Sequence, residues 1–275
     1  MSPATDAATG RRESDLRSAR DGGRKLLAPY VTGGLPGWER TVEACAAAGA
    51  DAIEVGIPFS DPVMDGPTIQ EASERALAAG ATPQDIVGAM GAIETGGVPL
   101  VVMTYYNTVH RYGHERFAAS LAAAGVAGAI VPDLPLEEAG EIGAELSGAR
   151  IALVPLVAPT TPDVRRRQIC QRAEGFVYVV SDTKVTGERD RLPDGLAELV
   201  AAVRADAAVP AAVGFGIGTP EQAAAVGRIA DGVIIGSRLV RAVSEADGMA
   251  PAVEAVSRFI HATRQALADG GRAVE

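Results

Sequence analysis

Three carboxylates stand close together in residues 54–65, in surroundings typical of a catalytic site. Glu54 lies inside an apolar run, Asp51-Ala-Ile-Glu-Val-Gly-Ile57, that is typical of a buried strand. Asp61 and Asp65 follow on a loop punctuated by proline and glycine. Burial disfavours the charged form of a carboxyl group and raises its pKa, which suits a general acid or base working near neutral pH. The alternative is that Glu54 is a structural carboxylate held by backbone hydrogen bonds at a strand end. The neighbouring loop favours the catalytic interpretation.

Glycine-containing segments late in the chain predict an anion site. Gly214-Phe-Gly-Ile-Gly218 follows one apolar run and precedes a helical pattern, and Gly236-Ser237 follows the next run. Glycines let backbone N–H groups approach an anion, and a helix N-terminus adds a favourable dipole. Val185-Thr-Gly187 is a third candidate. A Gly-Ser pair before a helix is commonly only a cap, but three such segments on successive strand ends predict a phosphate site.

The charge balance excludes nucleic acid as a partner. The 275 residues include 25 Lys and Arg against 35 Asp and Glu, a net charge of −10. Nucleic-acid binding requires clustered basic residues, so any anionic substrate must be held locally. Cys45 and Cys170 lack metal-ligand spacing, and His110 and His114 have no acidic residue between them as in a metalloprotease helix. We therefore expect no metal site and two isolated reduced thiols.

Neither a membrane span nor a secretory signal is expected. No uninterrupted apolar run approaches 18 residues. Residues 1–25 carry Arg and Asp throughout and have no apolar core. These features predict a cytoplasmic protein.

Short apolar runs alternate with helical patterns and predict a single-domain (β/α)₈ TIM barrel. Such alternation is typical of βαβ units, and near-continuous apolar runs are typical of strands covered on both faces. A doubly wound open sheet is the rival fold, but Thr32-Gly-Gly-Leu-Pro-Gly37 does not fit its dinucleotide fingerprint. The eight predicted strands are Leu26–Thr32, Ala52–Ile57, Leu100–Tyr105, Ala127–Pro132, Ile151–Leu156, Gly175–Val180, Pro210–Val213 and Gly232–Ile235.

A short N-terminal extension is expected before the barrel. We predict an extension over residues 1–23, disordered to about residue 12 and helical over Glu13–Arg20, and a barrel domain over residues 24–275. Helical spacing is clear at Glu39–Ala48, Pro220–Ile229 and Ala250–Ala268. Thr219-Pro220 places a capping residue before proline at the first helical position.

The segment Pro58-Phe-Ser-Asp-Pro-Val-Met-Asp-Gly-Pro-Thr-Ile-Gln70, placed just after Glu54, resembles the tryptophan synthase α subunit family. The resemblance covers about residues 24–265. Supporting segments are Pro29-Tyr-Val-Thr32, Met103-Thr-Tyr-Tyr-Asn107, Pro132-Asp-Leu-Pro135, Val185-Thr-Gly187, Gly214-Phe-Gly216 and Gly236-Ser237.

This resemblance implies retro-aldol cleavage of indole-3-glycerol phosphate to indole and glyceraldehyde 3-phosphate, without a cofactor. Glu54 then suits the acid that protonates indole C3, and its carboxylate suits the base that takes the glycerol hydroxyl proton. An ionised Asp65 would accept the indole N–H and stabilise the positive charge there. Two carboxylates in different environments would give the acid and anion roles at one pH.

The resemblance also implies the binding residues and a partner. The partner is a pyridoxal-phosphate β subunit that receives indole through a tunnel in an α₂β₂ assembly, and it docks on the loop that carries Asp61 and Pro62. The substrate-binding residues implied are Tyr105, Tyr178, Thr186 and Phe215, and those implied for the phosphate are Gly187, Gly216, Gly236 and Ser237.

Three positions depart from the family pattern. Ser181-Asp-Thr-Lys-Val-Thr-Gly187 has Asp182 where the family has Arg and Lys184 where it has Gly, and Leu35 stands where Asp is common. Lys in place of Gly predicts a different loop path or strain. The alternatives left open are a stand-alone lyase that releases indole for another pathway, a poorly catalytic regulatory partner of a β subunit, and another phosphate-binding barrel enzyme.

Overall fold

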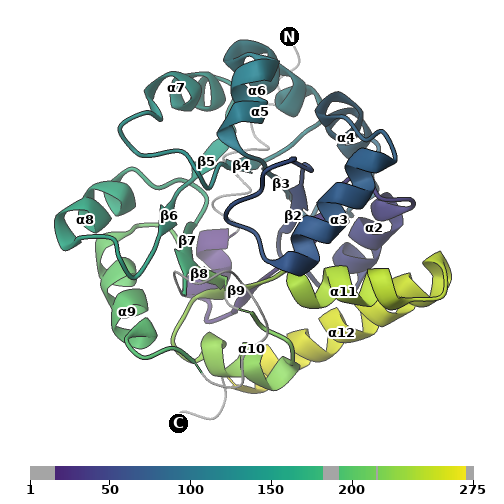
Figure 1. Ribbon diagram of the computed structural model, residues 1–275. Helices are drawn as coiled ribbons and strands as arrows, with labels where there is room; N and C mark the ends of the chain where they lie inside the picture. The colour runs from purple at the N-terminus through teal and green to yellow at the C-terminus, as the bar shows by residue number, and fades with distance from the viewer. Residues whose placement is uncertain (1–15, 182–191, 215, 271–275) are drawn as a thin grey trace.

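A ring of helices surrounds parallel strands in the computed structural model (Figure 1), which describes residues 16–181, 192–214 and 216–270. This is the predicted TIM barrel. The strands are β1 Leu26–Thr32, β2 Ile53–Gly56, β3 Leu100–Met103, β4 Gly128–Ile130, β5 Ala152–Val154, β6 Leu156–Val157, β7 Val177–Val180, β8 Ala211–Gly214 and β9 Gly232–Ile235.

The fifth predicted strand is divided in two, and this division lies where the barrel closes. The strand order is β5-β4-β3-β2-β1-β9-β8-β7-β6. Its two ends, β5 and β6, are separated in the chain by Pro155 alone. Proline has no N–H to donate to a ladder, but the Pro155 carbonyl accepts from the Tyr178 N–H at 2.9 Å. The segment 152–157 therefore pairs with β4 through its first half and with β7 through its second.

The helices match the predicted positions closely. The three expected from their spacing appear as α2, α10 and α12, and Thr219 caps α10 in a capping box with Gln222. The helices are α2 Trp38–Ala47, α3 Pro67–Ala78, α4 Pro83–Met90, α5 Tyr106–Tyr112, α6 His114–Ala123, α7 Gly140–Gly148, α8 Asp163–Gln171, α9 Leu196–Asp206, α10 Pro220–Gly227, α11 Ser237–Glu245 and α12 Met249–Gly270.

Alternate strand residues build two separate apolar clusters. Side chains of neighbouring strand residues point to opposite faces, so one set packs against the helices and the other fills the barrel. Leu27, Ile53, Val102 and Val177 belong to the outer cluster and are fully buried there. The inner cluster consists of Ala28, Ala52, Val101, Ile130, Val154, Phe176, Ala212 and Ile234. Glu54 lies two residues after Ala52 and therefore faces the barrel interior.

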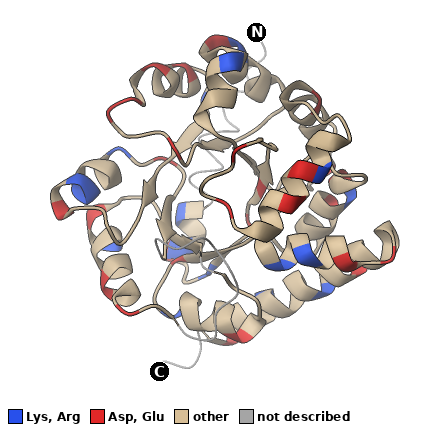
Figure 2. Cartoon of the chain, in the orientation of Figure 1, with Lys and Arg blue, Asp and Glu red and all other residues tan. Residues whose placement is uncertain are grey.

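Charged residues of both signs are interspersed over the outer helices (Figure 2). None of the helices among the described residues is long and apolar enough to cross a membrane. Residues 16–21 are helical, and Arg20 Nη1 donates to the Ala208 carbonyl at 2.8 Å. The predicted disorder before residue 12 lies outside the described residues, and the division into an extension and a barrel domain stays a prediction.

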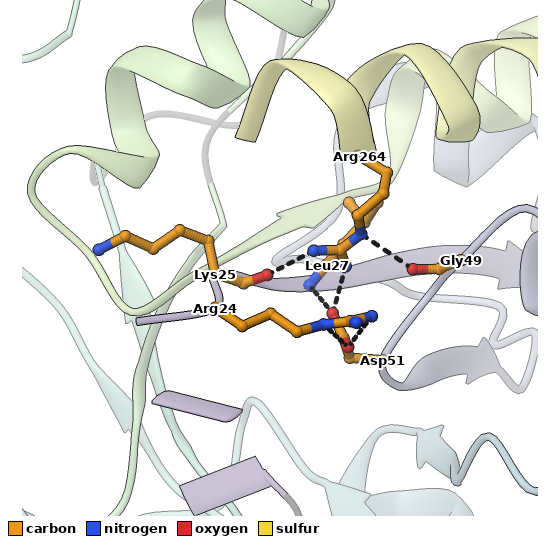
Figure 3. Close-up of polar contacts among 6 residues, drawn as sticks. All are labelled: Arg24, Lys25, Leu27, Gly49, Asp51 and Arg264. Carbon is orange, nitrogen blue, oxygen red and sulfur yellow. Dashed lines mark hydrogen bonds and ion pairs between the residues drawn. The ribbon is translucent and has the colours of Figure 1, made fainter. Parts of the chain in front are cut away.

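Asp51 anchors the last helix to the amino end of the barrel (Figure 3). The carboxylate accepts from the Leu27 N–H of β1 at 2.9 Å and forms ion pairs with Arg24 and with Arg264 of α12. Arg264 also donates to the Lys25 carbonyl at 2.7 Å. Each oxygen of this nearly buried carboxylate therefore has a partner.

Asp231 repeats the arrangement between β8 and β9. Its Oδ2 accepts from the Ala211 N–H at 3.0 Å, and its Oδ1 pairs with Arg204 Nε of α9 at 2.9 Å. Asp231 is 4% exposed, whereas the side chain of Arg204 is 47% exposed. Both aspartates thus precede a strand and bind the N–H of the neighbouring strand.

Candidate active site

Glu54 is a buried carboxyl group on β2. It is 3% exposed, and its strand register places it beside Tyr30 of β1 and Val101 of β3. Among the described residues, its Oε2 has no hydrogen-bond partner. Burial, with a smaller contribution from the nearby Asp65 carboxyl, raises the pKa of Glu54 from 4.5 to about 8. Glu54 is therefore mostly protonated at pH 7, as an acid must be.

Asp65 lies at the end of the loop that follows β2 and is held by Tyr105. The Tyr105 hydroxyl donates to Asp65 Oδ2 at 3.1 Å, and Asp65 is 8% exposed. Burial raises the pKa of Asp65 from 3.8 to about 6, while the hydrogen bond from Tyr105 lowers it. The two buried carboxyl groups therefore differ in charge at neutral pH, Asp65 being mostly ionised and Glu54 mostly neutral.

Glu54 and Asp65 line one cavity of about 100 Å³ at the carboxyl ends of the strands. Its walls are otherwise largely apolar, which suits a flat aromatic ring and keeps both carboxyl groups poorly hydrated. The apolar side chains that line it include Ile69, Met103, Ile130, Leu156, Ile217 and Ile234.

Two tyrosines occupy the barrel interior because each faces a glycine on the next strand. A Cβ on Gly56 would lie 2.0 Å from the Tyr30 hydroxyl oxygen, and one on Gly214 would lie 2.3 Å from that of Tyr178. Both tyrosines line the cavity, and the negative charges of Glu54 and Asp65 help to raise the pKa of each, after burial. Glycine at these positions therefore gives the tyrosine rings their space.

The predicted phosphate end lies on the same cavity. Gly216, Gly236 and Ser237 all line it, and Ser237 is the first residue of α11. The N-terminal N–H groups of that helix have no partner within the helix, so this end is suited to an anion. The cavity thus has an apolar part with two carboxyl groups and a polar part at a helix N-terminus.

Other predicted residues are either not described or absent from the described lining of this cavity. Thr186, Gly187, Phe215, Asp182 and Lys184 lie outside the described residues. Tyr105 is described and lies behind Asp65, and the described lining of the cavity does not include it. Asp61 and Pro62 are on the outer part of the loop before Asp65, where Asp61 is exposed.

Sequence reasoning missed Tyr30 as a cavity residue, although Pro29-Tyr-Val-Thr32 supported the resemblance. The signal that places it there is the register between Tyr30 and Glu54, which only the paired strands reveal. Leu35, at a departure from the family pattern, is 8% exposed in the outer apolar cluster. It lines a small void with Thr32 and Thr41.

A parallel barrel with a cavity at the carboxyl ends of its strands has the architecture of the TIM-barrel enzymes, whose active sites lie at that end. The chain belongs to the tryptophan synthase alpha chain family, whose model matches residues 16–268. The tryptophan synthase alpha chain of Chloroflexus aggregans is 48% identical over 226 residues, 80% of this chain and 85% of the relative. That of Methanosarcina mazei is 46% identical over 248 residues, 89% of each chain.

Solved structures give the same result. A chain of Mycobacterium tuberculosis tryptophan synthase superposes with a TM-score of 0.84 at 37% identity, covering 94% of this chain and 97% of that one. The tryptophan synthase alpha chain of Legionella pneumophila superposes with a TM-score of 0.85 at 33% identity, covering 96% and 99%. Fold and family therefore agree over nearly the whole length of both chains.

Proposed function

We propose that this chain is a carbon–carbon lyase that cleaves indole-3-glycerol phosphate into indole and glyceraldehyde 3-phosphate, as a tryptophan synthase alpha chain. The observation that carries the proposal is the pairing of Glu54 and Asp65 in one cavity whose other end is a helix N-terminus. Their different charge states at neutral pH, Glu54 mostly neutral and Asp65 mostly ionised, match the two roles that the reaction needs.

Glu54 gives up one proton during the reaction and takes one back. Its carboxyl group protonates indole C3, which turns the ring into an electron-accepting iminium, and Asp65 stabilises the charge by accepting the indole N–H. The Glu54 carboxylate then takes the proton of the glycerol hydroxyl as the carbon–carbon bond breaks. The electrons of that bond return to the ring, indole and the aldehyde form, and Glu54 is again protonated. The steps balance without an external acid, base or redox partner.

We propose the remaining roles for predicted residues that line the cavity. Tyr178 would contact the substrate beside Glu54, and Gly216, Gly236 and Ser237 would bind the phosphate through backbone N–H groups and the serine hydroxyl. The roles of Thr186, Phe215 and Gly187 stay predictions, because these residues lie outside the described part of the chain.

The partner we propose is a tryptophan synthase β subunit, in an α₂β₂ assembly. The loop that carries Asp61 and Pro62 also exposes Val63, at 71%, and Met64, at 47%. Large exposed apolar side chains next to a charged residue suit a protein interface. The cytoplasmic location stays a prediction.

Indole release from indole-3-glycerol phosphate by the isolated chain, alone and with added β subunit, tests the proposal. Slow release that the partner accelerates is expected, with a rate that falls below pH about 6 as Asp65 is protonated and above about 8 as Glu54 ionises. Fast release that ignores the partner would instead identify a stand-alone lyase. Absence of release under both conditions would contradict the proposed activity and leave a regulatory role or another phosphate-bearing substrate.

A further inference from the structure

Tyr105 is placed to act on Asp65 rather than on a substrate. It follows β3 at the N-cap of α5 and is 3% exposed. Asp65 lines the cavity, and the Tyr105 hydroxyl meets its carboxylate.

Both hydrogen-bonding capacities of the Tyr105 hydroxyl are in use within the chain. It donates to Asp65 Oδ2 at 3.1 Å and accepts from the Met64 N–H at 2.9 Å. A phenol has one hydrogen to donate, so in this arrangement Tyr105 cannot also donate to a ligand. One oxygen therefore joins a buried carboxylate to the backbone of an exposed residue.

Further contacts hold the loop in place around the Tyr105 hydroxyl. The rings of Phe59 and Tyr105 stack with centroids 5.1 Å apart, and Gln70 Nε2 donates to the Asp65 carbonyl at 2.9 Å. Val63 and Met64, with Asp61, lie exposed between these fixed points. A contact made on residues 61–64 thus has a short hydrogen-bonded route to the Asp65 carboxylate.

We infer that Tyr105 is a positioning residue for Asp65, and that its hydroxyl couples the carboxylate to the exposed segment 61–64. The inference rests on the proposed function, in which Asp65 accepts the indole N–H and this segment meets the β subunit. A displacement of the Met64 N–H shifts the Tyr105 hydroxyl, which orients the Asp65 carboxylate. A partner that contacts residues 61–64 therefore acts on this carboxylate without touching it.

Tyr105→Phe tests the inference, with Tyr112→Phe as a matched control. The first variant keeps the ring on Phe59 and removes only the hydroxyl. The control makes the same change at a buried tyrosine of α5, whose hydroxyl donates to Ser120 Oγ at 3.1 Å. Both variants are compared with wild type in kcat, KM, the pH dependence of kcat and deuterium exchange at the Met64 amide.

Tyr105→Phe is expected to lower kcat roughly tenfold with little change in KM, the scale of one lost hydrogen bond to a charged group. Because that bond lowers the pKa of Asp65, its loss moves the acidic limb of the profile to higher pH. The Met64 amide exchanges faster, and Tyr112→Phe changes none of these.

A raised KM at unchanged kcat would overturn the inference, since it indicates direct substrate contact. Equal behaviour of the two variants would overturn it too. If the wild-type chain releases no indole, the proposed function fails, yet Met64 exchange still decides the coupling: faster exchange in Tyr105→Phe alone supports it and unchanged exchange overturns it.

Discussion

At the amino end of the barrel, Asp51 and Asp231 are buried carboxylates with a partner for every oxygen. Backbone N–H groups of the neighbouring strands, Arg24 before β1, and arginines from α9 and α12 supply these partners. At the carboxyl end, Glu54 is buried as deeply but its Oε2 has no partner, and its pKa is raised to about 8. The comparison teaches that a buried carboxyl group with a partner on every oxygen serves the structure, whereas burial and the nearby Asp65 carboxyl keep the proton on Glu54 and available for transfer.

Among the variants that test this comparison, Glu54→Gln is expected to have the largest effect, which is on kcat. The substitution keeps the shape of the side chain and removes the transferable proton, so kcat for indole release falls by about 100-fold or more. Circular dichroism should show an unchanged fold. Retained turnover in a correctly folded variant would remove Glu54 from the acid role.

The same variant tests the charge state of Glu54 through stability. The folded pKa of about 8 lies above the ordinary 4.5, so between these values the unfolded chain releases a proton that the folded chain keeps. The free energy of unfolding contributed by Glu54 therefore falls as pH rises through this window. Urea unfolding at several pH values between these limits should show Glu54→Gln gaining stability relative to wild type as pH rises. A constant difference would mean that Glu54 ionises normally in the folded protein.

At the amino end, the expected effect is on stability and not on chemistry. Asp51→Asn leaves the guanidinium of Arg264, whose side chain is only 18% exposed, without its carboxylate. The free energy of unfolding should fall by about 3 kcal/mol, with kcat of the folded enzyme unchanged. Glu254→Gln is the control on the same helix, because the Glu254–Arg258 pair is exposed and its loss should change stability by less than about 0.5 kcal/mol. Equal losses in the free energy of unfolding of the two variants would contradict the expected difference between a buried and an exposed ion pair.

A smaller loss is expected for Asp231→Asn. Its partner Arg204 is 47% exposed and regains water when the charge is removed, and an asparagine oxygen can still accept from the Ala211 N–H. The loss should be about 1 kcal/mol in urea unfolding. A loss as large as that of Asp51→Asn would mean that exposure of the arginine does not set the cost.

Periodicity and turn chemistry were enough to predict the barrel. Apolar runs gave the strands, and Thr219-Pro220 gave the start of α10. The division at Pro155 was not predicted, because the run Ile151–Leu156 is apolar throughout and only the pairing with two different neighbours exposes the break. Strand ends were also overestimated: β3 ends at Met103, and the hydroxyl of Tyr105, two residues later, donates to Asp65.

The candidate site was predicted from motifs, and its geometry required the structure. Glu54, Asp65, Gly236 and Ser237 were named from the sequence, and all four line one cavity. The hydrogen bond between Tyr105 and Asp65 joins residues 40 positions apart. No local pattern in the sequence encodes such a contact, so Tyr105 was assigned to substrate by resemblance alone.

The two tyrosines and the two glycines that they cover have a consequence for the history of this sequence. Each pair lies across neighbouring strands, Tyr30 with Gly56 and Tyr178 with Gly214, and neither glycine tolerates a side chain while its tyrosine is present. A lineage that replaces such a glycine must first, or at the same time, shrink or redirect the tyrosine. These positions will therefore covary among relatives as two pairs, and an intermediate that changes the glycine alone will be absent.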